Sequence, residues 1–175
     1  MTKKSFIILA LLFALPALPQ EFEHEPVVTL GTPQILNDAS VLPGSGLVST
    51  GQPNAEVLEA AAKAGYVAVV DMRLPEEDRG IDERAVTERL GMSYVAFPIG
   101  APDTVTWENA AALDEILAGF DGPVLMHCAS GNRVGALLAL RAKANGASSE
   151  QALEIGKQGG LTRYEKVVRE RLELE

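Results

Sequence analysis

Residues 123–146 read PVLMHCASGNRVGALLALRAKANG, and this stretch decides the fold. It opens with a short apolar run typical of a buried strand and passes through a polar loop that starts at Cys128, the chain's one cysteine. It ends in a long helical pattern that Gly146 terminates. A strand that runs through a tight loop into a helix is part of a βαβ unit, so the stretch predicts an α/β domain.

The same alternation of strand and helix patterns continues on both sides of this stretch. Strands are predicted at residues 46–50, 66–72 and 92–98, and helices at 54–65, 82–91 and 106–120. Two further helices follow Gly146, with capping-box spacings from Ser148 to Gln151 and from Thr162 to Glu165. Short right-handed connections between these elements predict a three-layer α/β fold. Its mostly parallel sheet has four to five strands and carries helices on both faces.

The front of the chain carries a different pattern. Two lysines precede an unbroken apolar run and then prolines and small residues, which is the order of a secretory signal peptide over residues 1–20. Export, to the periplasm, is therefore expected, with an uncleaved N-terminal anchor as the alternative. Residues 21–40 are expected to form a linker or edge segment that carries a solvated His24, and residues 41–175 to form the domain.

Charge and composition exclude several classes of partner. The formal net charge is −9, which argues against nucleic acid and, beyond a possible N-terminal anchor, against an anionic membrane. A single cysteine forms no internal disulfide. The two histidines lie far apart in the sequence and show no metal-ligand spacing, so we expect neither a metal nor a cofactor.

The predicted topology brings distant residues to one edge of the sheet. In parallel α/β sheets, ligands bind beyond the carboxyl ends of the strands. Four loops leave that edge. Three of them carry Gln52, Arg73 and Asp103, and the fourth is the loop that begins at Cys128. We therefore expect these side chains to converge on a common site.

The cysteine loop has the parts of an anion site built around a nucleophile. Backbone N–H groups of Ala129, Ser130, Gly131 and Asn132, together with the positive end of the next helix, stabilise a thiolate and hold an anion. Gly131 permits a backbone angle that a larger residue resists, and Arg133 offers a planar fork for a tetrahedral oxyanion. The plainer alternative is a buried structural cysteine with polar neighbours.

The motif HCASGNR resembles the signature loop of cysteine-dependent protein phosphatases, His-Cys-x-x-Gly-x-x-Arg. With STGQP, VVDMR, FPI and the late GGLT, residues 41–165 resemble the phosphatase-like domain of beta-lactamase hydrolase-like proteins. The resemblance implies a dual-specificity-phosphatase-like fold. It also implies Cys128 as nucleophile, Arg133 as oxyanion clamp and Asp103 as proton donor to the leaving oxygen.

The loop departs from the phosphatase motif in two ways. Four residues separate Cys128 from Arg133, where phosphatases have five, and Val134 stands in place of a hydroxyl residue, which leaves Ser130 to contact the thiolate. A loop of this length resembles that of rhodanese-type sulfurtransferases, and VVDMRLPEEDRG echoes a rhodanese pattern as well. The helical pattern at 148–158 favours the phosphatase architecture, because a rhodanese returns to a strand there.

The supporting residues each have two interpretations. Asp103 is either the general acid or an acid at a helix N-terminus. Arg73 either braces its loop by an ion pair with Glu77 or contacts the ligand, and Gln52 either contacts the ligand or serves the turn before Pro53. His127 is expected to orient the loop through a hydrogen bond and not to act as a base.

Three functions fit these features. The leading hypothesis is hydrolysis of a phosphomonoester through a phosphocysteine on Cys128. The second is sulfur transfer through a Cys128 persulfide, in which Asp103 is dispensable. The third is a non-catalytic anion or partner-binding module. The expected partner is accordingly a small anionic substrate or a phosphorylated molecule.

Overall fold

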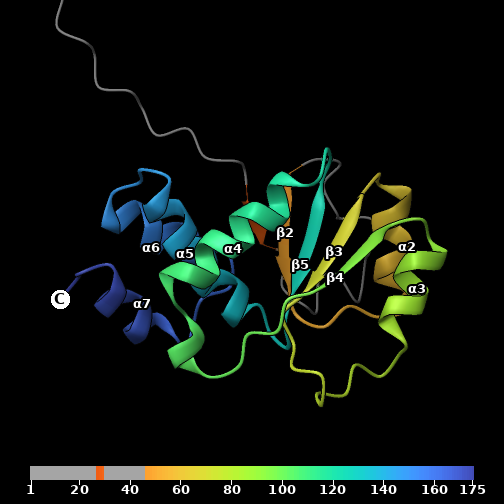
Figure 1. Cartoon of the computed structure of the whole chain (residues 1–175), viewed down its shortest axis with the longest axis horizontal. Helices are drawn as coiled ribbons and strands as arrows, with labels where there is room; N and C mark the ends of the chain where they lie inside the picture. The colour runs from red at the N-terminus through yellow and green to blue at the C-terminus, as the bar shows by residue number, and fades with distance from the viewer. Residues whose placement is uncertain (1–26, 30–45) are drawn as a thin grey trace, which may run out of the picture.

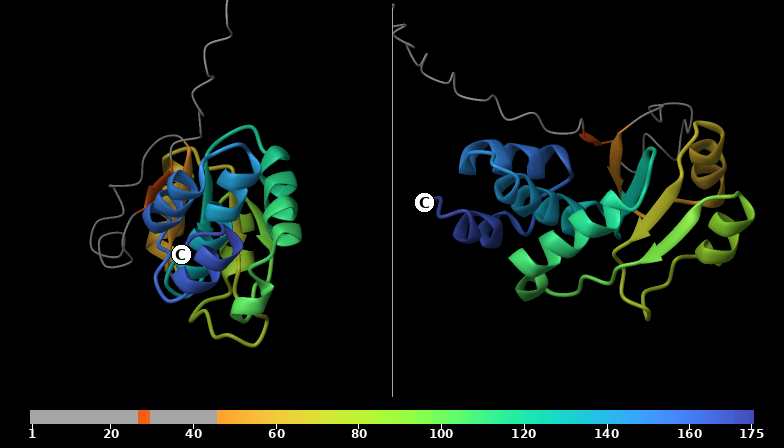
Figure 2. Two further views of the ribbon diagram at one scale, coloured as in Figure 1. Left: turned by 90° about the vertical axis from the view of Figure 1, so that its left-hand side faces the viewer. Right: turned by 45° about the horizontal axis from the view of Figure 1, so that its top comes forward.

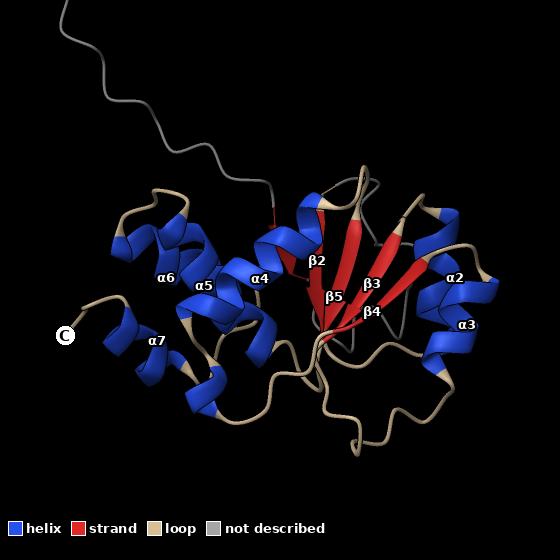
Figure 3. Ribbon diagram, in the orientation of Figure 1, coloured by secondary structure: helices blue, strands red, loops and turns tan. Residues whose placement is uncertain are grey.

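The computed structural model describes residues 27–29 and 46–175. The five strands found in these residues form one sheet, in which all pairings are parallel (Figures 1 and 3). Its order is β1-β2-β5-β3-β4. The strands are β1 (Val27–Thr29), β2 (Leu47–Thr50), β3 (Ala68–Asp71), β4 (Ser93–Ala96) and β5 (Val124–His127). This confirms the predicted α/β class. The predicted signal peptide and His24 lie outside the described residues.

Helices cover both faces of the sheet, as Figure 2 shows. Two lie against one face: α2 (Ala55–Lys63) and α3 (Glu83–Arg89). On the other side lie α4 (Trp107–Ala118), α5 (Asn132–Ala144), α6 (Ser149–Gln158) and α7 (Glu165–Arg171). A short 3-10 helix, η2 (Pro102–Thr104), precedes α4.

Alternation along the strands divides the core into two clusters. In β5, Val124 and Met126 pack into the cluster under α4 and α5, whereas Leu125 packs into the cluster under α2. Successive side chains of a strand point to opposite faces, and both faces of this sheet are covered. The strand next to Cys128 is therefore buried on both sides and gives the cysteine loop a fixed base.

The central helix of the larger layer is α5, which is apolar around most of its circumference because it is surrounded. Its residues 134–140 are all buried. Its glycine, Gly135, lies against the backbone of Gly156 and Leu161, so that an added Cβ would come within 2.5 Å of the Gly156 carbonyl oxygen. This close approach holds α6 and the segment that follows it against the start of α5.

Side chains cap several of the helices, and one of the two predicted capping boxes is present. Side chains of Asp82, Thr106 and Ser148 each accept a hydrogen bond from the backbone at the start of α3, α4 and α6, and the Ser148 capping box is complete. The capping box predicted at Thr162 is wrong. Helix α7 begins only at Glu165, because the Thr162 hydroxyl donates a hydrogen bond to Asn132 and does not cap the helix.

The sheet extends further toward the N-terminus than residue 41. Strand β1 lies in the segment predicted as a linker or edge segment, and it pairs with β2 at the edge of the sheet. The edge strand therefore belongs to the domain.

In the described part of the chain, no helix has the length and apolar character needed to cross a membrane.

Candidate active site

The cysteine loop leaves the carboxyl end of β5, at the edge where the strands converge in Figure 1. Cys128 is buried, with 1% of its surface exposed, and its N–H donates to the carbonyl of Thr50 over 3.4 Å. Ala129 and Ser130 are exposed, and Ser130 forms an isolated bridge with Gly51. The thiol thus lies at the base of the loop while the loop's tip faces solvent.

The turn into α5 leaves backbone donors available for an anion. Gly131 adopts the left-handed conformation, with φ = 81°. A glycine accepts this backbone angle easily, as predicted from its place in the loop. The N–H of Gly135 donates to the Gly131 carbonyl over 2.8 Å, so the N–H groups at residues 132–134 lie before the first hydrogen bond of the helix. No side chain caps this helix. The arrangement is that of a helix N-terminal anion site.

Arg133 is held beside the cysteine by a carboxylate. Its two Nη atoms donate to the two oxygens of Glu77 over 2.6 and 2.8 Å, and one of them also donates to the carbonyl of Ile99 over 2.8 Å. The hydrogen bonds from Arg133 lower the pKa of Glu77 to about 2. Glu77 in turn raises the pKa of Arg133. The clamp predicted from the motif is therefore charged and is oriented by Glu77.

A second arginine shares the same carboxylate. Arg73 Nε lies 3.2 Å from Glu77 Oε2, which is the bracing ion pair that formed one of the two predicted roles. Arg73 also donates to Gln52, whose amide donates to Glu83 over 2.8 Å. Two guanidinium groups therefore meet one carboxylate at Glu77.

Asn132 faces away from the loop. Its Oδ1 accepts from the N–H of Thr162 over 2.9 Å, from the hydroxyl of Thr162 over 3.2 Å and from the N–H of Tyr164 over 3.2 Å. The side chain is buried. Asn132 thus ties the loop to the segment before α7, and only its backbone faces the anion site.

The structure places Asp103 on η2, exposed to solvent. It lines a cavity of about 320 Å³ together with Val167, Glu170 and Arg171 of α7. The segment that leads from β4 to Asp103 contacts the cysteine loop at Ile99, whose carbonyl oxygen accepts a hydrogen bond from Arg133. Within the described residues no hydrogen bond or ion pair joins Asp103 to the loop, so its role as general acid stays a prediction.

His127 takes part in a buried polar cluster that no sequence motif indicates. Its Nδ1 lies 3.4 Å from the Cys128 carbonyl oxygen, and its Nε2 lies 2.7 Å from Glu83 and 3.5 Å from Asp71. All three side chains are fully buried. Glu83 follows the cap residue Asp82 and looks like an ordinary acid of a first helical turn, so the local sequence gave no sign of this contact.

The fold is that of the dual-specificity and tyrosine phosphatases, a class of cysteine-dependent enzymes. A candidate phosphatase of Neisseria meningitidis superposes with a TM-score of 0.62 at 20% identity, covering 77% of this chain and 96% of that one. P. aeruginosa TpbA in complex with phosphotyrosine superposes with a TM-score of 0.52 at 20% identity, covering 78% and 93%. The chain belongs to the family "Beta-lactamase hydrolase-like protein, phosphatase-like domain", whose model matches residues 44–145.

Curated relatives carry the same family name. The beta-lactamase hydrolase-like protein of Xylella fastidiosa is 29% identical over 112 residues, which is 62% of this chain and 26% of that protein. The corresponding protein of Agrobacterium fabrum is 27% identical over 119 residues, 65% of this chain and 27% of its own length. The chain thus spans about a quarter of the length of these relatives.

Proposed function

We propose that the protein hydrolyses phosphomonoesters through a phosphocysteine on Cys128. The observation that carries the proposal is the arrangement of the loop: Cys128 lies buried at the end of β5, and after four intervening residues Arg133 lies in the uncapped first turn of α5, paired with Glu77. Membership in the phosphatase-like family and the fold both support it.

The reaction proceeds in two displacements. The Cys128 thiolate attacks phosphorus, the bond to the leaving oxygen breaks, and Asp103 gives that oxygen its proton. Asp103 then takes a proton from water, which attacks the phosphocysteine and releases phosphate and the thiolate. Backbone N–H groups at residues 132–134 and the guanidinium of Arg133 stabilise the charge on the equatorial oxygens.

To bind the phosphate, the guanidinium of Arg133 must exchange some of its present hydrogen-bond partners for phosphate oxygens. Its two Nη atoms are engaged by Glu77 and by backbone carbonyls. Glu77 keeps the neighbouring Arg73 as a partner when Arg133 turns toward an anion, because the two arginines share this carboxylate. The site thus offers a charged clamp that can change partners without leaving a carboxylate unpaired.

An acid-quench experiment tests this proposal. The full chain and its Cys128→Ser variant are mixed briefly with an aryl phosphate and quenched in acid, and the intact masses are measured. The aryl phosphate is chosen because a structural neighbour binds phosphotyrosine. A phosphoryl adduct on the parent chain alone supports the proposal. Release of phosphate without an adduct, equal in both chains, contradicts it.

One observation favours a second candidate, sulfur transfer. Only four residues lie between Cys128 and Arg133, and this smaller ring should fit three equatorial phosphoryl oxygens less well than a five-residue loop does. In this reaction the thiolate attacks the outer sulfur of thiosulfate, the S–S bond breaks, sulfite leaves and Cys128 carries a persulfide. Cyanide then takes the sulfur as thiocyanate.

The two candidates separate in the same measurement. With thiosulfate in place of the aryl phosphate, a mass increase of one sulfur atom on the parent chain and none on Cys128→Ser identifies a persulfide. An adduct with thiosulfate alone favours the sulfurtransferase, and one with the aryl phosphate alone favours the phosphatase. No adduct with either substrate points to a binding module.

A further inference from the structure

Three donor side chains from three elements meet directly behind the cysteine loop. Asp71 ends β3, Glu83 begins α3 and His127 ends β5. One ligand atom from each lies within 4.8 Å of the other two, and all three side chains are buried. A histidine nitrogen and two carboxylate oxygens form a donor set that binds divalent transition metals such as zinc.

The donors that face the centre of this cluster are not satisfied by one another. His127 Nε2 lies 2.7 Å from Glu83 Oε1, yet neither atom has a partner in hydrogen-bonding geometry. His127 Nδ1 lies next to the Cys128 carbonyl oxygen, so Nε2 is the ring nitrogen that faces the two carboxylates. A metal ion held between these atoms would give each of them a partner.

The other carboxylate oxygens of these side chains are held by hydrogen bonds. Asp71 Oδ2 accepts from Arg79 and from the Tyr94 hydroxyl, each over 2.6 Å. Asp71 Oδ1, which faces His127, also accepts from the backbone N–H of Arg73 over 2.8 Å. Glu83 Oε2 accepts from Gln52 over 2.8 Å. Metal-binding histidines and carboxylates characteristically have such outer hydrogen bonds, which fix the orientation of the ligand atoms.

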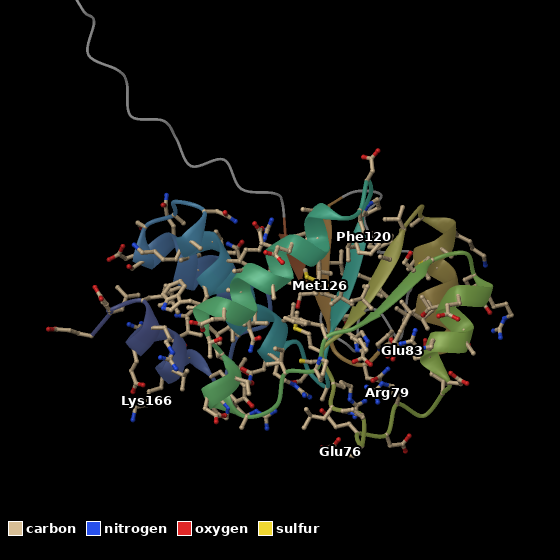
Figure 4. All side chains as sticks on the ribbon, in the orientation of Figure 1. Glu76, Arg79, Glu83, Phe120, Met126 and Lys166 are labelled. Carbon is tan, nitrogen blue, oxygen red and sulfur yellow. The ribbon has the colours of Figure 1, made fainter. Side chains whose placement is uncertain are left out.

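Charge and access agree with a bound cation. Asp71 has Arg79 as a partner, but among the described residues no lysine or arginine pairs with Glu83, a carboxylate that is 1% exposed. A buried carboxylate without a cation is costly. Arg79, Glu83 and Tyr94 also line a cavity of about 290 Å³, and Figure 4 shows Arg79 and Glu83 near each other beside the start of α3. The cavity thus borders the cluster at Glu83.

We propose that Asp71, Glu83 and His127 bind one divalent transition-metal ion. The ion joins the ends of β3 and β5 to the start of α3, and through His127 it fixes the backbone from which Cys128 projects. Its role is structural, so the site stands whichever reaction Cys128 performs.

The test measures metal directly in a chain without the thiol. The full chain is prepared as Cys128→Ser, because a free thiolate also binds zinc. It is purified without chelators after growth with zinc, and its metal content is counted by mass spectrometry of the elements. Two variants follow in the same background: Glu83→Gln, which keeps the shape and the amide contact to Gln52, and Glu88→Gln, a matched change at an exposed position of the same helix.

The expected result is one zinc per chain in the parent and in Glu88→Gln, and less than a tenth of that in Glu83→Gln. Zinc at a hundredfold excess over its dissociation constant should raise the melting temperature of the metal-free parent by about 5–10 °C, and that of Glu83→Gln not at all. A parent chain without metal and without a zinc-dependent shift overturns the proposal. Equal zinc in Glu83→Gln and Glu88→Gln also overturns it, since the metal then lies elsewhere on the acidic surface.

Discussion

Glu77 and Arg133 lie 56 residues apart in sequence and meet through two hydrogen bonds of 2.6 and 2.8 Å. The loop after β3 thereby orients the charged end of the cysteine loop. Fork-to-fork pairing of arginine with a carboxylate is both strong and directional. The pair therefore couples the stability of this edge of the sheet to the geometry of the anion site.

Glu77→Gln should change how stability depends on pH. Because the folded pKa of Glu77, about 2, lies below its usual value, the carboxylate stabilises the fold above pH ~4.5, and this contribution is lost as the pH falls toward 2. The variant should lose about 1–3 kcal/mol at pH 7, the value of charged hydrogen bonds, and almost nothing at pH 2. Urea unfolding at several pH values measures both.

Glu88→Gln is the control for this prediction. Its ion pair with Arg84 is more than half exposed on both sides, so the substitution should change stability by less than about 0.5 kcal/mol. A Glu77→Gln protein whose stability falls in parallel with the parent between pH 5 and 2 would contradict the assignment of the low pKa to the Arg133 contact.

Asn132→Asp should separate stability from anion binding. Aspartate keeps an oxygen for the three hydrogen bonds from Thr162 and Tyr164, and its charge is favourable at a helix N-terminus. The same charge next to the loop repels an anionic substrate. We expect stability within about 1 kcal/mol of the parent and an aryl phosphate kcat/KM lower by about tenfold or more.

Asn132→Ala supplies the opposite result. It leaves the buried donors of residues 162 and 164 without their acceptor, which should cost about 2–4 kcal/mol in urea unfolding. Equal loss of stability in both variants would show that the amide is needed for a reason other than its three contacts.

The elements of the fold were predictable from sequence because most of their signals are local. Asp82, Thr106 and Ser148 each cap the helix that follows them, and the apolar run before Cys128 is a strand between two covered faces. The failure at Thr162 has a non-local cause, since its hydroxyl donates to Asn132, a residue of a different helix. Caps are predictable only where no distant acceptor competes for the side chain.

The sequence indicates the residues of the cysteine loop, but not the buried residues that pack behind the loop. Cys128, Gly131 and Arg133 lie within six residues, so a short motif indicates them. The contact of Glu83 with His127 depends on how α3 lies against the end of β5, which no local pattern specifies. For the same reason, the spacing of the two histidines gave no indication of a cluster built from one histidine and two carboxylates.

Asp103→Asn should show whether η2 supplies the proton donor. A general acid matters most when the leaving group is a poor one, so the variant should lose about 10²–10⁴-fold in kcat with an alkyl or phenyl phosphate. With a nitrophenyl phosphate, whose leaving group needs no proton, the loss should be much smaller. Steady-state rates with both substrates measure the difference. Equal rates for parent and variant with both substrates would remove Asp103 from the mechanism.

Gly135→Ala should destabilise the protein even though alanine is the better helix former. Helix propensity alone predicts a gain of about 1 kcal/mol at an interior helical position. The added Cβ, however, would overlap the backbone nitrogen of Leu161 and lie 2.5 Å from the Gly156 carbonyl oxygen, and backbone atoms cannot rotate out of the way. Separation of α6 from α5 should therefore cost about 3 kcal/mol or more in urea unfolding.

Alanine substitutions at two other glycines distinguish the cost of a steric clash from the cost of backbone strain. Gly80 and Gly131 both have positive φ angles, and a Cβ at Gly80 meets nothing within 4 Å, whereas one at Gly131 meets atoms only at ordinary contact distance. Alanine at either position should cost about 1–2 kcal/mol from the left-handed backbone alone. A Gly135→Ala variant no less stable than these two would mean that α5 and α6 can move apart freely. The cysteine loop would then depend on the sheet for its position, and not on the packing of α6 against α5.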